Sequence, residues 1–184
     1  MDKLRIGILG LGRGFTHLKN FLALVEAEVI GACDRFPLLR ERAAEHIASV
    51  DASTAVLREY DELLDLKPDA IMVATNGKMQ VEHACQALRS GCHVLSEVPG
   101  AYTQEECMRL REVVEYTGKT YMLGENTCYW DFFRYFRKWV AADEFGPISI
   151  AEGEYIHHLP ATLFRPDSSR HTPTSAKVAG HEDT

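Results

Sequence analysis

Glycines cluster near the N-terminus, in the run GLGRG at residues 10–14, directly after the apolar segment 4–9. Glycine permits a tight turn, lets a backbone approach a pyrophosphate closely, and leaves the N-terminus of a following helix facing negative charge. Phe15 stands where the third glycine of such a turn usually lies, and Gly14 comes one residue earlier. The same turn can also be purely structural, so its surroundings decide between the two interpretations.

An acidic residue, Asp34, ends the second apolar segment, residues 28–33. A carboxylate at this point of a strand–helix–strand unit can accept hydrogen bonds from both hydroxyls of a ribose, which favours NAD over NADP. Arg35 keeps NADP open as the alternative, because a guanidinium beside the ribose can pair with a phosphate. We therefore expect a dinucleotide site here, formed by Gly10, Gly12, Arg13, Gly14, Phe15, Asp34 and Arg35.

Apolar runs that resemble buried strands alternate with amphipathic segments along most of the chain. Strands are expected at 4–9, 28–33, 69–75, 92–96 and 120–123, and helices at 16–25, 37–50, 60–66, 78–90 and 103–118. Continuous apolar strands indicate a parallel sheet covered on both faces, and right-handed crossovers favour a doubly wound order. The predicted fold class is α/β, a Rossmann-type doubly wound parallel sheet.

The pattern of apolar residues changes after residue 124. Aromatic residues crowd one expected helix in 129–146, and partial alternation in 148–156 suggests the first strand of a second sheet. Residues 165–184 contain three apolar side chains, too few to offset the entropy of ordering. We expect a nucleotide-binding domain at 1–124, the truncated start of an α+β substrate domain at 125–164, and a disordered polar tail at 165–184.

Composition excludes several classes of protein. The 184 residues are 46% hydrophobic and 26% charged, as in globular proteins, and the net charge of −7 disfavours nucleic acid and anionic membranes as partners. No apolar run is long enough to span a membrane, and no signal peptide is evident, so we expect a cytoplasmic protein. The five cysteines contain no CxxC pair, which predicts free thiols and no metal site.

Two strings carry a resemblance to a known family: ALRSG at 87–91 and HVLSEVP at 93–99, together with Ala74-Thr75. With the glycine turn, they resemble the Gfo/Idh/MocA oxidoreductases from Leu4 to about Leu159. The resemblance implies a Rossmann domain followed by an open antiparallel sheet, hydride transfer between a sugar or cyclitol hydroxyl and nicotinamide, and a homo-oligomer. It also implies cofactor contacts at Thr75, Asn76, Glu97, Val98 and Asn126.

The chain departs from that family at three points. Val98 stands where the family has a lysine that assists proton transfer, and valine can neither donate nor accept a proton. Gln80 occupies the position where the family often has a histidine, whereas the nearby His83 falls on another helix face and suits a structural role. The later Asp and His motif of the family's substrate domain has no counterpart in this chain.

One branch of the family, the NAD-dependent glycosidases, is more similar at these points. The Glu97-Val98 pair, the string MLGEN at 122–126 and YIH at 155–157 match that branch, although His158 stands where the branch commonly has Asp. There the cofactor oxidises a ring hydroxyl, the glycosidic group is eliminated, water adds and the hydride returns. The resemblance implies catalytic roles for Glu97, Tyr155 and His157, although His157 could equally be an ordinary strand histidine.

Three functions therefore stay open from the sequence. The first is an NAD(P)-dependent oxidoreductase acting on a sugar or cyclitol. The second is a redox-neutral NAD-dependent glycosidase, favoured by Val98 and by the Glu125-Asn126 segment. The third is a non-catalytic dinucleotide-binding fragment, because most of the implied substrate sheet is missing.

Overall fold

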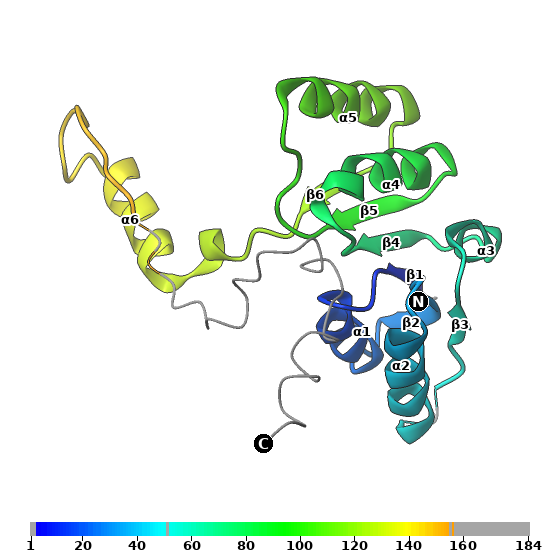
Figure 1. Cartoon of the computed structure of the whole chain (residues 1–184). Helices are drawn as coiled ribbons and strands as arrows, with labels where there is room; N and C mark the ends of the chain where they lie inside the picture. Colours follow the sequence, from blue (N-terminus) through cyan, green and yellow to red (C-terminus); the bar gives the residue numbers. More distant parts are fainter. Residues whose placement is uncertain (1–2, 51, 155, 157–184) are drawn as a thin grey trace, which may run out of the picture. The chain divides into compact units, whose positions relative to one another are not determined.

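The computed structural model describes residues 3–50, 52–154 and 156. The chain divides into two compact units, residues 1–124 and 125–184. The first unit contains six strands and five α-helices (Figure 1). The strands are β1 (Leu4–Leu9), β2 (Ala27–Cys33), β3 (Ala55–Leu57), β4 (Ala70–Val73), β5 (His93–Ser96) and β6 (Tyr121–Leu123). The helices are α1 (Gly14–Leu22), α2 (Pro37–Ser49), α3 (Tyr60–Asp65), α4 (Gly77–Arg89) and α5 (Gln104–Thr117).

The strands form one parallel sheet in the order β3-β2-β1-β4-β5-β6. The chain first builds outward from β1 to β3 and then returns to build from β4 to β6 on the other side. The order therefore reverses between β1 and β4, and an open α/β sheet binds ligands at the carboxyl ends of strands beside such a reversal. This arrangement confirms the Rossmann-type fold expected from the sequence.

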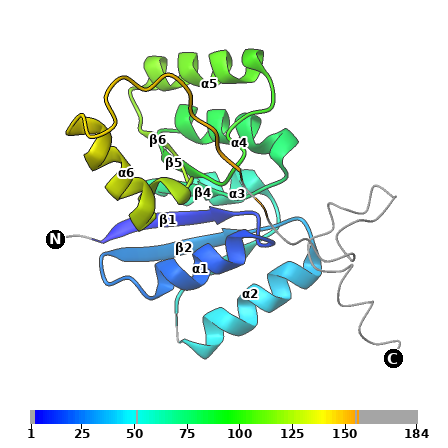
Figure 2. The same cartoon turned by 90° about the vertical axis from the view of Figure 1, so that its left-hand side faces the viewer.

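Both faces of the sheet are buried, which explains why its strands lack polar alternation. Ile8 and Met72 face the core that α1 and α2 cover, whereas Leu9 and Ile71 face the core that α3, α4 and α5 cover. Figure 2 shows the two groups of helices on opposite sides of the strands. Neighbouring residues of one strand thus belong to different cores, so each strand joins the two layers.

Three expected helix boundaries correspond to local signals. Pro37 occupies the first turn of α2. Thr103 and Glu106 form a capping box at the start of α5, and Gly118 ends that helix in the left-handed conformation. These residues fix the helix ends through their own backbone preferences, which is why the sequence indicated them.

The helix expected at 16–25 is wrong at both ends. In the structure α1 begins at Gly14, inside the glycine run, and ends at Leu22. Val25 is 77% exposed, because residues 24–27 form a turn in which the Ala27 amide donates to the Leu24 carbonyl before β2 begins. The spacing of Val25 from the apolar residues of α1 therefore fits a helical period, although Val25 is not part of the helix.

Strand β3 was missed in the sequence, and a later strand was expected where none is found. The three residues of β3 are too few to show a period, and they pair only with the end of β2. In the second unit, residues 148–154 and 156 form no strand, so the expectation for 148–156 is wrong for the part of it that the structure describes. A strand needs a neighbour to accept and donate its backbone hydrogen bonds. No sheet strand among the residues described lies beyond Leu123.

The described residues of the second unit form a short 3₁₀ helix, η1 (Thr127–Tyr129), and an α-helix, α6 (Asp131–Ala141). The large aromatic side chains of its described residues are between 39% and 63% exposed. Some pack on one another: the Phe132 and Phe133 rings are 4.4 Å apart, and those of Phe136 and Phe145 are 5.2 Å apart. The tail expected at 165–184 lies outside the residues that the structure describes.

Candidate cofactor site

Gly10 lies where the carboxyl ends of β1 and β4 come closest. Its φ is +89°, and a Cβ atom added there would lie 2.6 Å from the Ala74 carbonyl oxygen. Real Cβ atoms do not approach backbone so closely, and L-residues rarely adopt this conformation. The turn between β1 and α1 can therefore form in this shape only with glycine at position 10.

Gly14 serves the close packing of α1 on the sheet. A Cβ there would lie 3.2 Å from the Ala74 Cβ and 3.3 Å from the Ile8 Cγ2. Phe15, the residue at the usual third glycine position, is instead buried in the core beneath α1, and the Arg42 guanidinium lies 3.7 Å from the centre of its ring. The helix begins at Gly14, so the third glycine of the turn has moved one residue toward the N-terminus and keeps its packing role.

Asp34 closes the turn from the end of β2. The residue is 8% exposed; its Oδ2 accepts from the Leu11 amide at 2.7 Å, and its Oδ1 accepts from the Phe36 amide at 2.9 Å. Each carboxylate oxygen has two acceptor positions, so both retain capacity for a ribose hydroxyl. The Arg35 guanidinium lies 4.7 Å from the centre of the Phe36 ring. Asp34 thus has a structural role that the sequence did not reveal.

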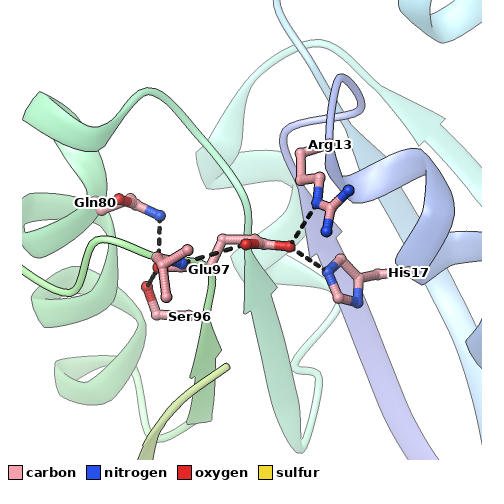
Figure 3. Close-up of polar contacts among 6 residues, drawn as sticks. Arg13, His17, Gln80, Ser96 and Glu97 are labelled. Atoms are coloured by element: carbon pink, nitrogen blue, oxygen red, sulfur yellow. Dashed lines mark hydrogen bonds and ion pairs between the residues drawn. The ribbon is translucent and has the colours of Figure 1, made fainter. Parts of the chain in front are cut away.

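Glu97 follows β5 and is the most heavily bonded side chain of the site (Figure 3). Its Oε1 accepts from Arg13 Nε at 3.0 Å and lies 2.7 Å from His17 Nε2. Its main-chain oxygen accepts from Gln80 Nε2 at 2.8 Å and from the Ser96 hydroxyl at 3.2 Å. Residues from α1, α4 and β5 therefore converge on one carboxylate-bearing residue.

The charge of Glu97 is set by these contacts. Burial raises the pKa of its carboxyl, but the hydrogen bonds from His17 and Arg13 and their positive charge outweigh burial, so the pKa lies below the ordinary 4.5. Glu97 is consequently ionised at neutral pH. A carboxylate of such low basicity is a poor proton acceptor, so this environment suits binding and electrostatic stabilisation better than general base catalysis.

The loop after β4 supplies Thr75 and Asn76. Asn76 caps α4, because its side-chain oxygen accepts from the Lys78 amide. Thr75 Oγ1 lies 2.9 Å from His83 Nδ1, and the His83 carbonyl accepts from the Tyr60 hydroxyl at 3.0 Å. Burial lowers the pKa of His83, which leaves it a neutral, hydrogen-bonded residue. These contacts agree with a structural role for His83.

Strands β2, β1, β4 and β5 are neighbours in the sheet, so their carboxyl ends bring the candidates of the first unit to one edge. Those candidates are Gly10, Gly12, Arg13, Gly14, Phe15, Asp34, Arg35, Thr75, Asn76, Glu97 and Val98. Asn126 belongs to the second unit, where its carbonyl accepts from the Tyr129 amide. Tyr155 and His157 lie outside the residues that the structure describes.

The donors and acceptors at this edge fit a dinucleotide. No side chain caps the first turn of α1, and the Arg13 side chain is 69% exposed, so amide groups and a guanidinium are available to a diphosphate. Asp34 and Glu97 can accept from ribose hydroxyls. Gln80 is fully buried, and its Oε1 has no hydrogen-bond partner among the residues described, which leaves one further acceptor close to Glu97.

His17 and Gln80 are the residues that sequence reasoning did not place in this cluster. Arg13 and His17 are four residues apart and hence on one side of α1, which is a weak signal that they share a partner. The partner follows β5, some 80 residues later, and only the fold shows that it lies opposite. For Gln80 the available signal was that it occupies the position where the family often has a histidine.

Membrane-spanning helices and metal centres are both absent from the described part of the chain. None of its helices combines the length and the apolar character that crossing a membrane requires. No three side chains among His, Cys, Asp and Glu in residues 3–50, 52–154 and 156 are grouped closely enough to hold a metal ion.

Curated relatives of this chain carry glycosidase names. It is 32% identical over 166 residues to the Glycosyl hydrolase family 109 protein 1 of Shewanella sp. strain MR-4, a match that covers 86% of this chain and 36% of the relative. It is 29% identical over 170 residues to the Glycosyl hydrolase family 109 protein 2 of Akkermansia muciniphila, with 89% and 36% covered. The chain thus spans little more than a third of the length of these relatives.

Among solved structures, the chain is similar to scyllo-inositol dehydrogenase from Lactobacillus casei with bound NAD(H) and scyllo-inositol. The TM-score is 0.70 at 23% identity, over 79% of this chain and 43% of that one. This likeness supports the fold. The model of the GFO_IDH_MocA family, described as an oxidoreductase family with an NAD-binding Rossmann fold, matches residues 4–125, more than half of the chain, which therefore belongs to that family.

Proposed function

We propose that the first unit binds NAD across the carboxyl ends of β1, β2, β4 and β5. Asp34 accepts from the adenosine ribose, the glycine turn and the start of α1 receive the diphosphate, and Glu97 and Val98 border the nicotinamide half. NADP is the less favoured cofactor, because the Asp34 carboxylate would repel a 2′-phosphate. The observation that carries this proposal is the convergence of a glycine turn and two buried carboxylates at the reversal of strand order.

In the whole protein we propose hydride transfer between a sugar or cyclitol hydroxyl and the nicotinamide. When bound, the cofactor supplies the site that takes up or returns a hydride. The chain's own residues bind and orient it, and the ionised Glu97 contributes negative charge beside the positive ring of the oxidised cofactor. We also propose that residues 125–164 begin the domain that binds the substrate and that 165–184 form a polar tail.

A redox-neutral glycosidase is the second candidate, and two observations favour it. Val98 replaces the lysine that an ordinary sugar dehydrogenase of the family would use for the hydroxyl proton, and the curated relatives have glycosidase names. In this reaction Tyr155 and His157 are the proposed acid–base residues. Both belong to residues 125–164, the proposed start of the substrate domain.

Further proposals concern the setting of the protein. All five cysteines are free thiols, which supports a reducing compartment and hence the cytoplasm. Exposed aromatic side chains on α6 leave apolar surface that another domain or a second copy would bury, which supports a homo-oligomer.

Purified protein incubated with NAD and a panel of sugars, cyclitols and aryl glycosides separates the candidates. Accumulation of NADH, followed by its absorbance, supports the oxidoreductase. Release of the aglycone without net NADH supports the glycosidase. Calorimetric binding of NAD with no turnover of any compound supports a dinucleotide-binding fragment, and absence of NAD binding contradicts all three.

A further inference from the structure

One side of α1 contacts the residue that ends β5. Arg13 and His17 are one helical turn apart, and both reach the same oxygen, Oε1 of Glu97, at 3.0 and 2.7 Å (Figure 3). Among the residues that the structure describes, the other oxygen, Oε2, accepts only from the Val98 amide, at 3.2 Å. The contact with α1 therefore fixes the direction of the carboxylate and leaves Oε2 with acceptor capacity.

The main chain of Glu97 is held as firmly as its side chain. The Gln80 amide group, which is buried, donates to the Glu97 carbonyl, and so does the hydroxyl of the buried Ser96. The Glu97 side chain is 11% exposed and that of His17 is 25% exposed. A largely buried carboxylate that loses one of its two side-chain partners keeps its desolvation penalty, so His17 has a larger effect here than a surface ion pair would have.

The position of Glu97 mirrors that of Asp34. Asp34 follows β2 on one side of the glycine turn, and Glu97 follows β5 on the other side. A dinucleotide that lies across the turn has one ribose on each side. A carboxylate fixed at each end can accept from one ribose, and the diphosphate between them meets Arg13, whose guanidinium is largely exposed.

We propose that His17 is a positioning residue for cofactor binding: by bonding Glu97, it holds that carboxylate where it accepts from the ribose of the nicotinamide half. This inference rests on the proposed NAD binding and adds a residue that would not touch the cofactor. Arg13 and His17 are the ionisable side chains that act on Glu97 among the residues described. Arg13 offsets the negative charge of Glu97 at the place proposed for the diphosphate.

The test is a double-mutant cycle on NAD affinity, measured by calorimetry with the 184-residue protein. His17→Ala should weaken NAD binding about tenfold, the size of one hydrogen bond to a charged group. His17→Gln keeps an N–H donor and should stay within about threefold of the unmodified protein. Asn20→Ala, on the same side of α1 one turn further along and exposed, is the matched control and should bind normally.

The cycle is completed with Glu97→Gln alone and with His17→Ala added to it. If His17 acts through Glu97, the double variant should bind NAD no more weakly than Glu97→Gln alone. Additive losses, or a His17→Ala protein that binds as tightly as the unmodified one, would overturn the inference.

A second readout separates this inference from the proposed function. A carbon-13 NMR titration of the glutamate carboxyls needs no cofactor, and His17→Ala should raise the pKa of Glu97 whereas Asn20→Ala should not. If the unmodified protein fails to bind NAD, the proposed function fails, and the titration still shows whether His17 fixes Glu97. An unchanged Glu97 titration in His17→Ala contradicts the positioning role regardless of NAD.

Discussion

Gly10 and Gly91 have nearly the same backbone conformation in different surroundings. Their φ angles are +89° and +91°, but a Cβ on Gly10 would collide with Ala74 whereas none of the atoms described lies within 4 Å of one on Gly91. At Gly91 glycine is needed only for its backbone conformation, whereas at Gly10 it is also needed because there is no room for a Cβ atom.

We predict that Gly91→Ala lowers the free energy of unfolding by about 1 kcal/mol, the cost of the backbone conformation alone. Gly10→Ala should cost about 3 kcal/mol or more, because the ends of β1 and β4 must also move apart. Urea denaturation followed by circular dichroism measures both values. Equal losses in the two variants would show that the turn at Gly10 has more room than the structure indicates.

Asp34 should be important for stability as well as for NAD. Asp34→Ala leaves the Leu11 and Phe36 amides without their acceptor, so we predict a loss of about 1–3 kcal/mol in the free energy of unfolding. NAD affinity should also fall, by about tenfold.

Asp34→Asn serves as the control, since it keeps one acceptor oxygen and removes the charge. It should regain much of the stability and less of the affinity. Calorimetric NAD affinity unchanged in both variants would contradict the assignment of Asp34 to the ribose.

At the residue scale, the sequence indicated those residues whose position can be recognised from the residues next to them in the chain. The position of Asp34 directly after β2 could be predicted, because it follows an apolar run at a set distance from a glycine turn. His17 could not, because its partner is distant in the sequence and a histidine on an amphipathic helix has no distinguishing pattern of its own. The shift of the third glycine to Gly14 likewise depends on the Ala74 and Ile8 side chains that face it.

The contacts of Arg13 and His17 with Glu97 connect α1 to the end of β5, and the stabilisation that they provide depends on pH. Folding lowers the pKa of Glu97 below 4.5, so the unfolded chain binds the proton more readily. The stabilisation is therefore complete above about pH 4.5 and is lost as the pH falls through the lower pKa of the folded state.

We predict that the difference in free energy of unfolding between the unmodified protein and Glu97→Gln is largest near neutral pH and shrinks below pH 4.5. Urea denaturation at a series of pH values measures this difference. A difference that stays constant down to pH 3 would indicate that Arg13 and His17 do not favour the ionised form.

At the scale of elements, the sequence predicted those with their own start and stop signals. Pro37, Thr103 and Gly118 mark helix ends through local backbone chemistry, and the buried strands β1, β2 and β4 are continuous apolar runs. Elements defined by a neighbour were not predictable in the same way. Strand β3 forms because its backbone pairs with the edge of β2, and α1 ends where the chain turns toward β2.

For the whole molecule, the two units differ in how they are stabilised. Both clusters of buried core residues lie within residues 6–113, all in the first unit. We predict that a protein of residues 1–124 folds cooperatively and binds NAD within about threefold of the affinity of the full chain, because the site and its core are retained. Urea denaturation and calorimetry check this prediction, and a fragment that fails to unfold cooperatively would contradict it.

The sequence predicted the fold class and the doubly wound topology of the first unit, although not β3, because periodicity and handedness leave few arrangements open. It was less informative about the second unit, where amphipathic aromatic residues indicate a helix without indicating what covers it. The chain spans 36% of the length of the curated relative that it matches at 32% identity.

The buried and exposed thiols can be used to measure local unfolding of the first unit by chemical labelling. Cys33, Cys85 and Cys92 are buried, and burial, with the neighbouring Asp34 charge, raises the pKa of Cys33 to about 12; Cys107 is exposed and Cys128 half-buried. A small alkylating reagent should therefore label the last two quickly and the other three only as fast as the sheet opens. Because Cys33 ends β2 whereas Cys85 and Cys92 belong to the β4–β5 side, mass spectrometry of the labelled peptides would time the opening of each half separately. NAD should slow both halves together if it bridges them.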